Sequence, residues 1–147
     1  MSVQPTTDQL HQTLRRVRRT QAEHYNLASI LGESSGIRKV RNQVSAAASS
    51  TANVLIIGRE GTGRAHIARA VHYQWTADRQ LPLVPVDGAT ANEDLLRRCW
   101  DSLRDPAQNR HRGTLLVTHA DSLDESLQSI LCSAMQNAGG EVRLIAT

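Results

Sequence analysis

Apolar residues along this chain follow two alternating patterns. Short, nearly continuous apolar runs occupy residues 53–57, 81–86, 114–118 and 142–146. Between them, apolar residues recur at every third or fourth position, which is the period of a helix with one buried face. Runs of this kind that alternate with helices predict an α/β fold, in which a parallel sheet has helices on both faces.

The run at 81–86 differs from the other three because it contains Pro82 and Pro85. Proline has no backbone N–H and cannot donate a hydrogen bond to a neighbouring strand. We therefore expect this strand to lie at an edge of the sheet.

A separate helix is predicted over residues 8–25. Leu10, Leu14 and Val17 follow one another at helical spacing along one side of it. This apolar stripe is narrow, and a lone helix of this length is marginal in water. The stripe therefore needs a partner surface, either the same helix of a second subunit or the surface of the domain that follows.

The same helix carries a dense basic segment made of Arg15, Arg16, Arg18 and Arg19. These side chains could contact the phosphates of DNA. Alternatively, they form the solvated face of a linker or coiled-coil helix, which is the interpretation we favour. A loose polar tail is expected over residues 1–5. We accordingly divide the chain into a tail and basic linker helix, residues 1–27, and a folded domain, residues 28–147.

The composition of the 147 residues is that of an ordinary folded protein. Hydrophobic residues make up 39% of the chain and charged residues 21%, and the net charge is +3. No apolar run approaches the roughly 20 residues that span a membrane, and the polar N-terminus does not resemble a signal peptide. Cys99 and Cys132 lack metal-ligand spacing and are expected to be small core residues in a reducing compartment. We therefore expect a cytoplasmic protein with no membrane contact.

Residues 54–65 combine a short apolar strand, a glycine-rich turn and the start of a helix. This order is typical of a phosphate-binding loop, in which backbone N–H groups and the positive end of a helix hold an anion. The candidate binding residues are Gly58, Arg59, Glu60, Gly61, Thr62, Gly63, Arg64 and Ala65. The glycine spacing G-x-x-x-x-G is present, but Arg64 and Ala65 stand where such loops carry lysine and then serine or threonine. The backbone cradle is thus predicted without the two side chains that hold phosphate and magnesium.

Several motifs occur in an order that resembles one known family. They are ILGESSGIR at 30–38, GREGTG at 58–63, IARAVH at 67–72, GTLL at 113–116 and VRLIAT at 142–147. Together they resemble the AAA+ domain of sigma-54-dependent transcription activators, the bacterial enhancer-binding proteins, whose motifs read IIGES, GESGTGKE, ARAIH, GTLFLDE and RLIAAT. The resemblance implies a P-loop NTPase-like AAA+ sheet and ATP or ADP as the ligand of the glycine loop.

The departures from the family pattern lie at the positions that carry its chemistry. Arg64 is longer than the family's lysine and forked, so it fits the cradle badly. At the family's LFLDE motif this chain reads LLVTH, so Thr118 replaces the aspartate that organises Mg²⁺ and His119 replaces the glutamate that activates water. Asp121 is a weak substitute that we expect at the N-cap of the next helix, and His119 is more typical of a structural or solvated residue than of a general base. We therefore assign no catalytic and no metal-binding residue, and expect weak binding of ATP or ADP without Mg²⁺.

Two larger parts of the family domain have no counterpart here. The GAFTGA insertion is missing between residues 88 and 112, and the sequence stops at Thr147, before the family's sensor asparagine, fifth strand, arginine fingers and helical lid. The resemblance thus implies a degenerate, truncated AAA+ domain with the lid subdomain absent, acting as a transcription-regulatory or protein-interaction module. The alternatives are an active ATPase with noncanonical residues and a nucleotide-free adaptor of an intact AAA+ protein. In each case the expected partner is a protein, either a second copy or an intact AAA+ protein.

Overall fold

A computed structural model describes residues 6–76, 81–104, 113–137 and 141–147. The predicted polar tail at 1–5 lies outside these residues. The described part contains the following elements in chain order: α1 (Thr7–His24), η1 (Leu27–Ser29), α2 (Ser35–Ala48), β1 (Val54–Leu55), α3 (Arg64–Trp75), β2 (Leu83–Asp87), α4 (Glu93–Ser102), β3 (Gly113–Thr118), η2 (Ala120–Ser122), α5 (Glu125–Asn137) and β4 (Val142–Ala146). None of the described helices is long and apolar enough to cross a membrane.

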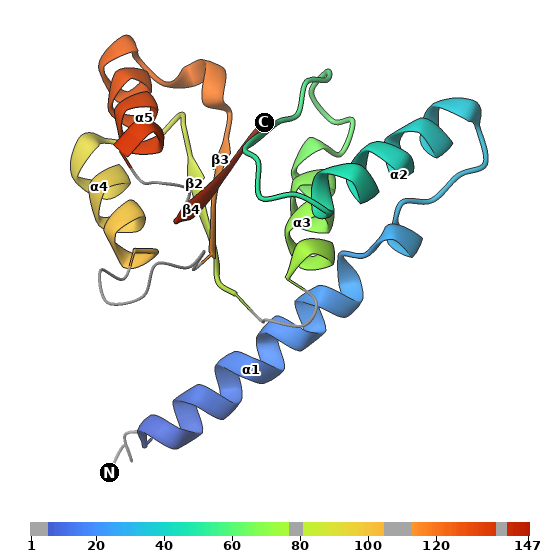
Figure 1. Cartoon of the computed structure of the whole chain (residues 1–147), viewed down its shortest axis with the longest axis horizontal. Helices are drawn as coiled ribbons and strands as arrows, with labels where there is room; N and C mark the ends of the chain where they lie inside the picture. The colour runs from blue at the N-terminus through green and yellow to red at the C-terminus, as the bar shows by residue number, and fades with distance from the viewer. Residues whose placement is uncertain (1–5, 77–80, 105–112, 138–140) are drawn as a thin grey trace.

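The strands form one parallel sheet in the order β1-β4-β3-β2 (Figure 1). The prediction that the proline-containing strand lies at an edge is confirmed. The N–H of Thr114 on β3 donates to the carbonyl of Pro82, and the N–H of Gly88 donates to the carbonyl of Thr118 on β3, whereas Pro85 is exposed. Because alternate residues of a strand bond to opposite neighbours, the nitrogen of Pro85 faces the open side, where no donor is needed.

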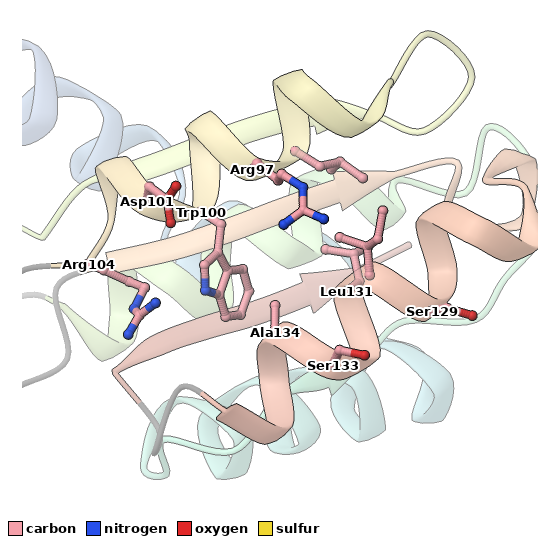
Figure 2. Close-up of a pocket in the computed structure, with 10 residues that line it drawn as sticks. Arg97, Trp100, Asp101, Arg104, Ser129, Leu131, Ser133 and Ala134 are labelled. Carbon is pink, nitrogen blue, oxygen red and sulfur yellow. The ribbon is translucent and has the colours of Figure 1, made fainter.

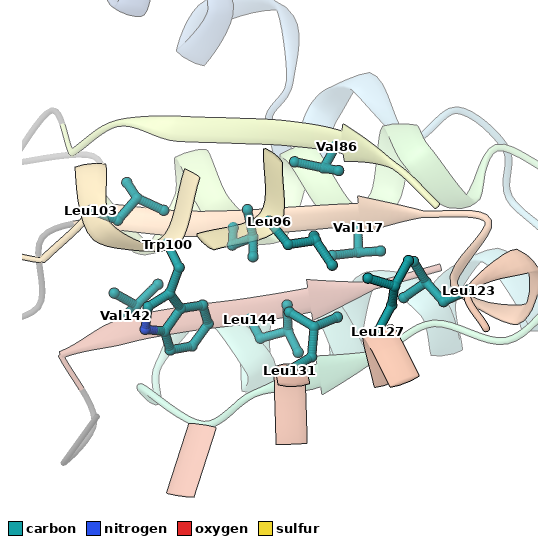
Figure 3. Close-up of a cluster of buried hydrophobic side chains, with 11 residues drawn as sticks. Val86, Leu96, Trp100, Leu103, Val117, Leu123, Leu127, Leu131, Val142 and Leu144 are labelled. Atoms are coloured by element: carbon teal, nitrogen blue, oxygen red, sulfur yellow. The ribbon is translucent and has the colours of Figure 1, made fainter. Parts of the chain in front are cut away.

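Helices cover both faces of this sheet, as predicted (Figure 1). Side chains alternate along each strand, so Leu115 and Val117 of β3 point towards α4 and α5, whereas Leu116 points towards α2 and α3. Figure 3 shows the first of these layers, in which Trp100 and Leu131 of the two helices close over the strands. The central strands are buried on both faces, which explains their continuous apolar sequence.

Helix α1 extends away from this domain and reaches it only near its C-terminal end (Figure 1). No residue of α1 is buried, and the side chains of Leu10, Leu14 and Val17 are each about half exposed. At the end of α1, the rings of Tyr25 and Tyr73 stack with their centroids 6.1 Å apart. The predicted helix is confirmed to within one residue, but the surface of its own domain does not cover the apolar stripe.

Two expectations from the sequence are wrong, one about a cysteine and one about the length of a strand. Cys132 is exposed, because it follows the inward-facing Leu131 of α5 by one residue and is therefore rotated away from the core. The strand expected at 53–57 is shorter than its apolar run, since β1 ends at Leu55 and only the N–H of Ile56 still bonds to Ala146 of β4. The chain then leaves the sheet to form the glycine loop.

Candidate functional site

The glycine loop connects the end of β1 to the start of α3, as the sequence predicts. Gly61 and Gly63 have φ angles of 76° and 86°, a left-handed conformation that residues with a side chain rarely adopt. The turn is closed within the loop, where the N–H and the hydroxyl of Thr62 donate to the carbonyl of Arg59 at 3.3 and 2.6 Å. Gly63 is the N-cap of α3 and no side chain caps that helix. The first N–H groups of α3 therefore remain available to an anion.

The predicted binding residues all lie in the glycine loop and the first turn of α3, but their side chains differ in exposure. Residues 58–63 are exposed, whereas Arg64 and Ala65 are half-buried in the first turn of α3. The stem of Arg64 lies over the loop: a Cβ added to Gly58 would be 3.5 Å from its Cγ and 3.0 Å from the hydroxyl oxygen of Thr62. The loop is thus packed closely around Gly58.

A cavity of about 680 Å³ lies next to the loop. Gly58, Thr62 and Arg64 line one part of it. The rest of its wall is formed mainly by apolar residues of α2, α3 and β1, namely Val40, Val44, Ala47, Val54, Leu55, Ile56, Ile57, Ile67 and Val71, together with Gln43. The loop therefore borders a largely apolar groove at the outer side of β1.

The end of β3 differs from a magnesium site in both side chains. The hydroxyl of Thr118 donates to the carbonyl of Val86 on the neighbouring strand at 3.4 Å. The side chain of His119 lies with Nδ1 2.9 Å from Oδ1 of Asp87, and both side chains are about half exposed. Because a carboxylate only accepts, Nδ1 carries the proton that is shared with Asp87. This hydrogen bond, together with one from the N–H of Ala89, lowers the pKa of Asp87 below its usual value.

The backbone at this point holds the ends of β2 and β3 together. His119 has a left-handed conformation, with φ 49° and ψ 48°, and turns the chain out of the strand. The N–H of Gly88 donates to the carbonyl of Thr118 at 2.7 Å. A side chain at Gly88 would collide with the carbonyl group of His119, so only glycine fits where these two backbone segments meet. The imidazole of His119 is consequently directed to the edge strand by both its backbone and Asp87.

Asp121 does not occupy the predicted position. It lies in η2, while Asp124 accepts hydrogen bonds from the N–H of Leu127 at 2.8 Å and from the hydroxyl of Ser126 at 2.7 Å at the start of α5. The prediction of Asp121 at the N-cap was wrong because this extra turn separates β3 from α5. Within the described residues, no three His, Cys, Asp or Glu side chains are arranged to hold a metal ion.

Sequence reasoning missed two polar contacts of this domain. Asp87 was not identified as the partner of His119, although its place directly after an apolar strand could have drawn attention to it. His72, which the sequence placed only at the end of the IARAVH motif, is fully buried, with Nε2 3.2 Å from the carbonyl of Leu81 and Nδ1 2.7 Å from the hydroxyl of Thr114. Burial lowers its pKa to about 4, so the imidazole is neutral and joins α3 to the sheet.

A second cavity, of about 390 Å³, lies between α4 and α5 (Figure 2). Trp100 forms part of its wall, and Arg97 and Arg104 of α4 lie along it. These arginines are already engaged, since Arg97 pairs with Glu93 and Arg104 with Glu141. None of residues 58–65 lines this cavity, which is thus separate from the glycine loop.

Comparisons with known proteins agree with this geometry. The family model described as the sigma-54 interaction domain matches residues 31–147. The Nif-specific regulatory protein of Herbaspirillum seropedicae is 27% identical over 147 residues, covering 92% of this chain and 27% of that protein. The chain spans about a quarter of the length of the curated relatives it matches first.

Solved structures show the same fold. NtrX from Brucella abortus in complex with ATP superposes with a TM-score of 0.66 at 19% identity, over 92% of this chain and 35% of that one. The P-loop NTPase domain of a sigma-54 transport activator from E. coli gives a TM-score of 0.55 at 24% identity, over 72% of this chain and 80% of that one.

Proposed function

This chain belongs to the family of sigma-54 interaction domains, and we propose that it is a regulatory AAA+ module that binds ATP or ADP weakly and does not hydrolyse ATP. The observation that carries the proposal is the end of β3. Thr118 and His119 stand at the positions where the family resemblance implies an acidic pair, and both side chains are engaged with β2. Neither position offers a carboxylate to a metal ion or to a water molecule.

Weak nucleotide binding is supported by the glycine loop. Gly61, Gly63 and the uncapped start of α3 supply backbone N–H groups, and these do not depend on the side chain at position 64. Residues 58–65 would hold the phosphates of ATP or ADP. This site suits a magnesium ion less well than it suits phosphate, because Ala65 offers no hydroxyl and Thr118 offers no carboxylate.

Two measurements on the purified chain test this function. ATP turnover is expected to stay at the background level, and a titration with ATP is expected to show weak binding that is the same with and without Mg²⁺. Turnover that disappears in the Arg64→Ala variant would disprove the proposal. Complete absence of nucleotide binding would instead favour the nucleotide-free adaptor.

A second candidate function, an ATPase with noncanonical residues, is favoured by one contact. Asp87 holds Nδ1 of His119, which leaves Nε2 as a free acceptor in the neutral imidazole, the arrangement of an oriented general base. We rank it second because the same contact directs the imidazole towards the edge strand, away from β1 and its loop. Turnover that is lost in both His119→Asn and Asp87→Asn would support it.

We propose a protein partner for this module in preference to DNA. Among the four arginines of α1, Arg19 pairs with Glu23 at 3.2 Å, and Arg18 is half-buried near enough to α3 that its charge helps to lower the pKa of His72. These two guanidinium groups are thus partly engaged within the chain.

The cytoplasm remains our proposal for the location, in keeping with the free thiols of Cys99 and Cys132.

A further inference from the structure

The cavity between α4 and α5 has an apolar base and a polar rim (Figure 2). Leu96, Trp100 and Leu131 form the base and are almost completely buried. The rim consists of the exposed residues Arg97, Asp101, Arg104, Ser129 and Ser133. A volume of about 390 Å³ is small for a ligand pocket and far too small for a helix, which is about 10 Å wide. It suits a few apolar side chains that project from one face of a helix.

Such a face exists on α1. The side chains of Leu10, Leu14 and Val17 lie along one side of this helix, and each is about half exposed. They are spaced over about 10 Å along the helix axis, at about 1.5 Å per residue. The residues of α5 that line the cavity, from Ser129 to Ala134, extend over about 8 Å by the same rise. The apolar stripe and the cavity are therefore similar in length.

Helix α1 is attached to the side of the sheet that does not carry this cavity. At its C-terminal end Tyr25 stacks on Tyr73 of α3, and the guanidinium group of Arg69 lies 5.5 Å from the centre of the Tyr25 ring. Helices α2 and α3 cover one face of the sheet, whereas α4 and α5 cover the other (Figure 1). While this junction holds, the stripe of α1 is on the wrong side of the sheet for the cavity of its own chain.

The two surfaces also differ in charge. Residues 1–80, which form α1, α2 and α3, carry 11 arginine or lysine side chains and 5 carboxylates. Residues 81–147, which form α4 and α5, carry 6 arginines and 9 carboxylates. The basic helix α1 is therefore attracted to the α4–α5 side of another copy. Two α1 helices, in contrast, would bring together two sets of four arginines.

We propose that the apolar stripe of α1 docks into the α4–α5 cavity of a second copy of this chain, and that the second copy returns the same contact. Leu10, Leu14 and Val17 fill the cavity, and the arginines of α1 face the acidic side of the partner. Exchange in both directions closes a twofold dimer, the usual form of a homodimer. The glycine loop takes no part in this interface, so the inference does not depend on nucleotide binding.

Salt dependence tests this arrangement without any variant. Sedimentation velocity from roughly 1 to roughly 500 μM protein is expected to show a dimer that dissociates on dilution. Because opposite charges meet, the dissociation constant should rise between about 50 and about 500 mM salt. A dimer that tightens over this range would overturn the proposal, since screening favours the pairing of two basic α1 helices. A chain that stays monomeric throughout would also overturn it.

Variants on each surface test the two halves of the contact. Leu14→Asp places a charge in the stripe, and Ser133→Arg places a bulky charge at the rim of the cavity, so each should raise the dissociation constant by about tenfold or more. Gln12→Asp on the opposite side of α1 is one matched control. Cys132→Arg is the other, because Cys132 is exposed on α5 and does not line the cavity. Both controls should behave as the wild type, and circular dichroism checks that all four variants are folded.

Mixing the two disruptive variants separates this dimer from one in which α1 pairs with itself. The Leu14→Asp chain keeps an intact cavity and the Ser133→Arg chain keeps an intact stripe, so a mixed dimer regains one of the two contacts. The mixture is therefore expected to associate more tightly than either variant alone. A mixture no tighter than the separate variants would contradict the proposal. So would full association of Ser133→Arg alone together with loss of association in Leu14→Asp, because that pattern places the interface on α1 only.

Discussion

Nδ1 of His119 lies 2.9 Å from Oδ1 of Asp87 and thereby links the ends of two neighbouring strands. The contact joins residues that are 32 positions apart and exists because β2 and β3 pair in register, with Asp87 opposite Thr118. It gives the histidine a structural role at the position where the family resemblance implies a water-activating glutamate. The histidine at the position of the family's glutamate is therefore held in place by Asp87.

Among the residues that join the ends of β2 and β3, Gly88 is expected to tolerate substitution least. In Gly88→Ala the new methyl group meets the carbonyl of His119, so we expect the free energy of unfolding to fall by about 2 kcal/mol. Gly36→Ala is the control, because a Cβ there is 3.8 Å from the hydroxyl of Ser34 and makes an ordinary contact. That control should change stability by less than about 0.5 kcal/mol. Urea unfolding of both variants measures the difference. An equal change in the free energy of unfolding would show that the backbone of His119 leaves room for a side chain at Gly88.

The glycine loop leads to a prediction about nucleotide and metal. A ligand present at about 100 times its dissociation constant stabilises a protein by about 2.7 kcal/mol, which is visible as a shift of several degrees in the melting temperature. We expect millimolar ATP or ADP to give a smaller shift that EDTA leaves nearly unchanged, since Thr118 and Ala65 supply no magnesium ligand. A large shift that depends on Mg²⁺ would mean that Asp121 or another carboxylate has taken over the metal role.

The backbone origin of this binding is testable separately. Gly63 has a φ of 86°, so Gly63→Val strains the turn that presents the N–H groups and should abolish the shift. Arg64→Ala removes a side chain and leaves the backbone in place, so most of the shift should remain. Loss of the shift in Arg64→Ala alone would show that the guanidinium group, and not the cradle, holds the phosphates.

The buried His72 predicts how stability depends on pH. Its pKa is about 4 in the folded protein and about 6.5 in the unfolded chain, so between these values only the unfolded chain binds the proton. The contribution is fully present above about pH 6.5 and is lost as the pH falls towards 4, up to about 3 kcal/mol. In His72→Gln this part of the slope should disappear, whereas His11→Gln, on the exposed face of α1, should keep it. Thermal melts across pH 4–7 give the comparison, and parallel curves for wild type and His72→Gln would contradict it.

The sequence predicted the buried elements more closely than the exposed ones. The runs 114–118 and 142–146 became β3 and β4 to within one residue, because strands covered on both faces must be apolar at every position. The run at 53–57 gave only two residues of strand, and Ile57 at its end is 86% exposed. An apolar run indicates that burial is favourable, but it does not say whether a neighbouring strand is present to provide it.

The candidate site was predictable only where its chemistry is local in sequence. The glycine loop depends on consecutive residues and was found by their spacing. The partners of His119 and His72 depend on the register of distant segments, since Asp87 and Thr114 lie 32 and 42 positions away along the chain. No periodicity carries that information. Asp121 was misplaced for a related reason, because a short turn such as η2 has no apolar pattern of its own.

The arginines of α1 provide the last prediction, which separates a protein partner from DNA. At about 150 mM salt the screening length is about 8 Å, so exposed charges alone give only weak, sequence-independent DNA binding. We expect fluorescence anisotropy with duplex DNA to show no tight binding at this salt, and little change when Arg15, Arg16, Arg18 and Arg19 are replaced by alanine. Arg97→Ala with Arg98→Ala on α4 is the control for a general loss of positive charge. Tight binding at this salt that falls steeply as salt is raised, and that is lost only in the α1 variant, would instead establish α1 as a DNA-binding helix.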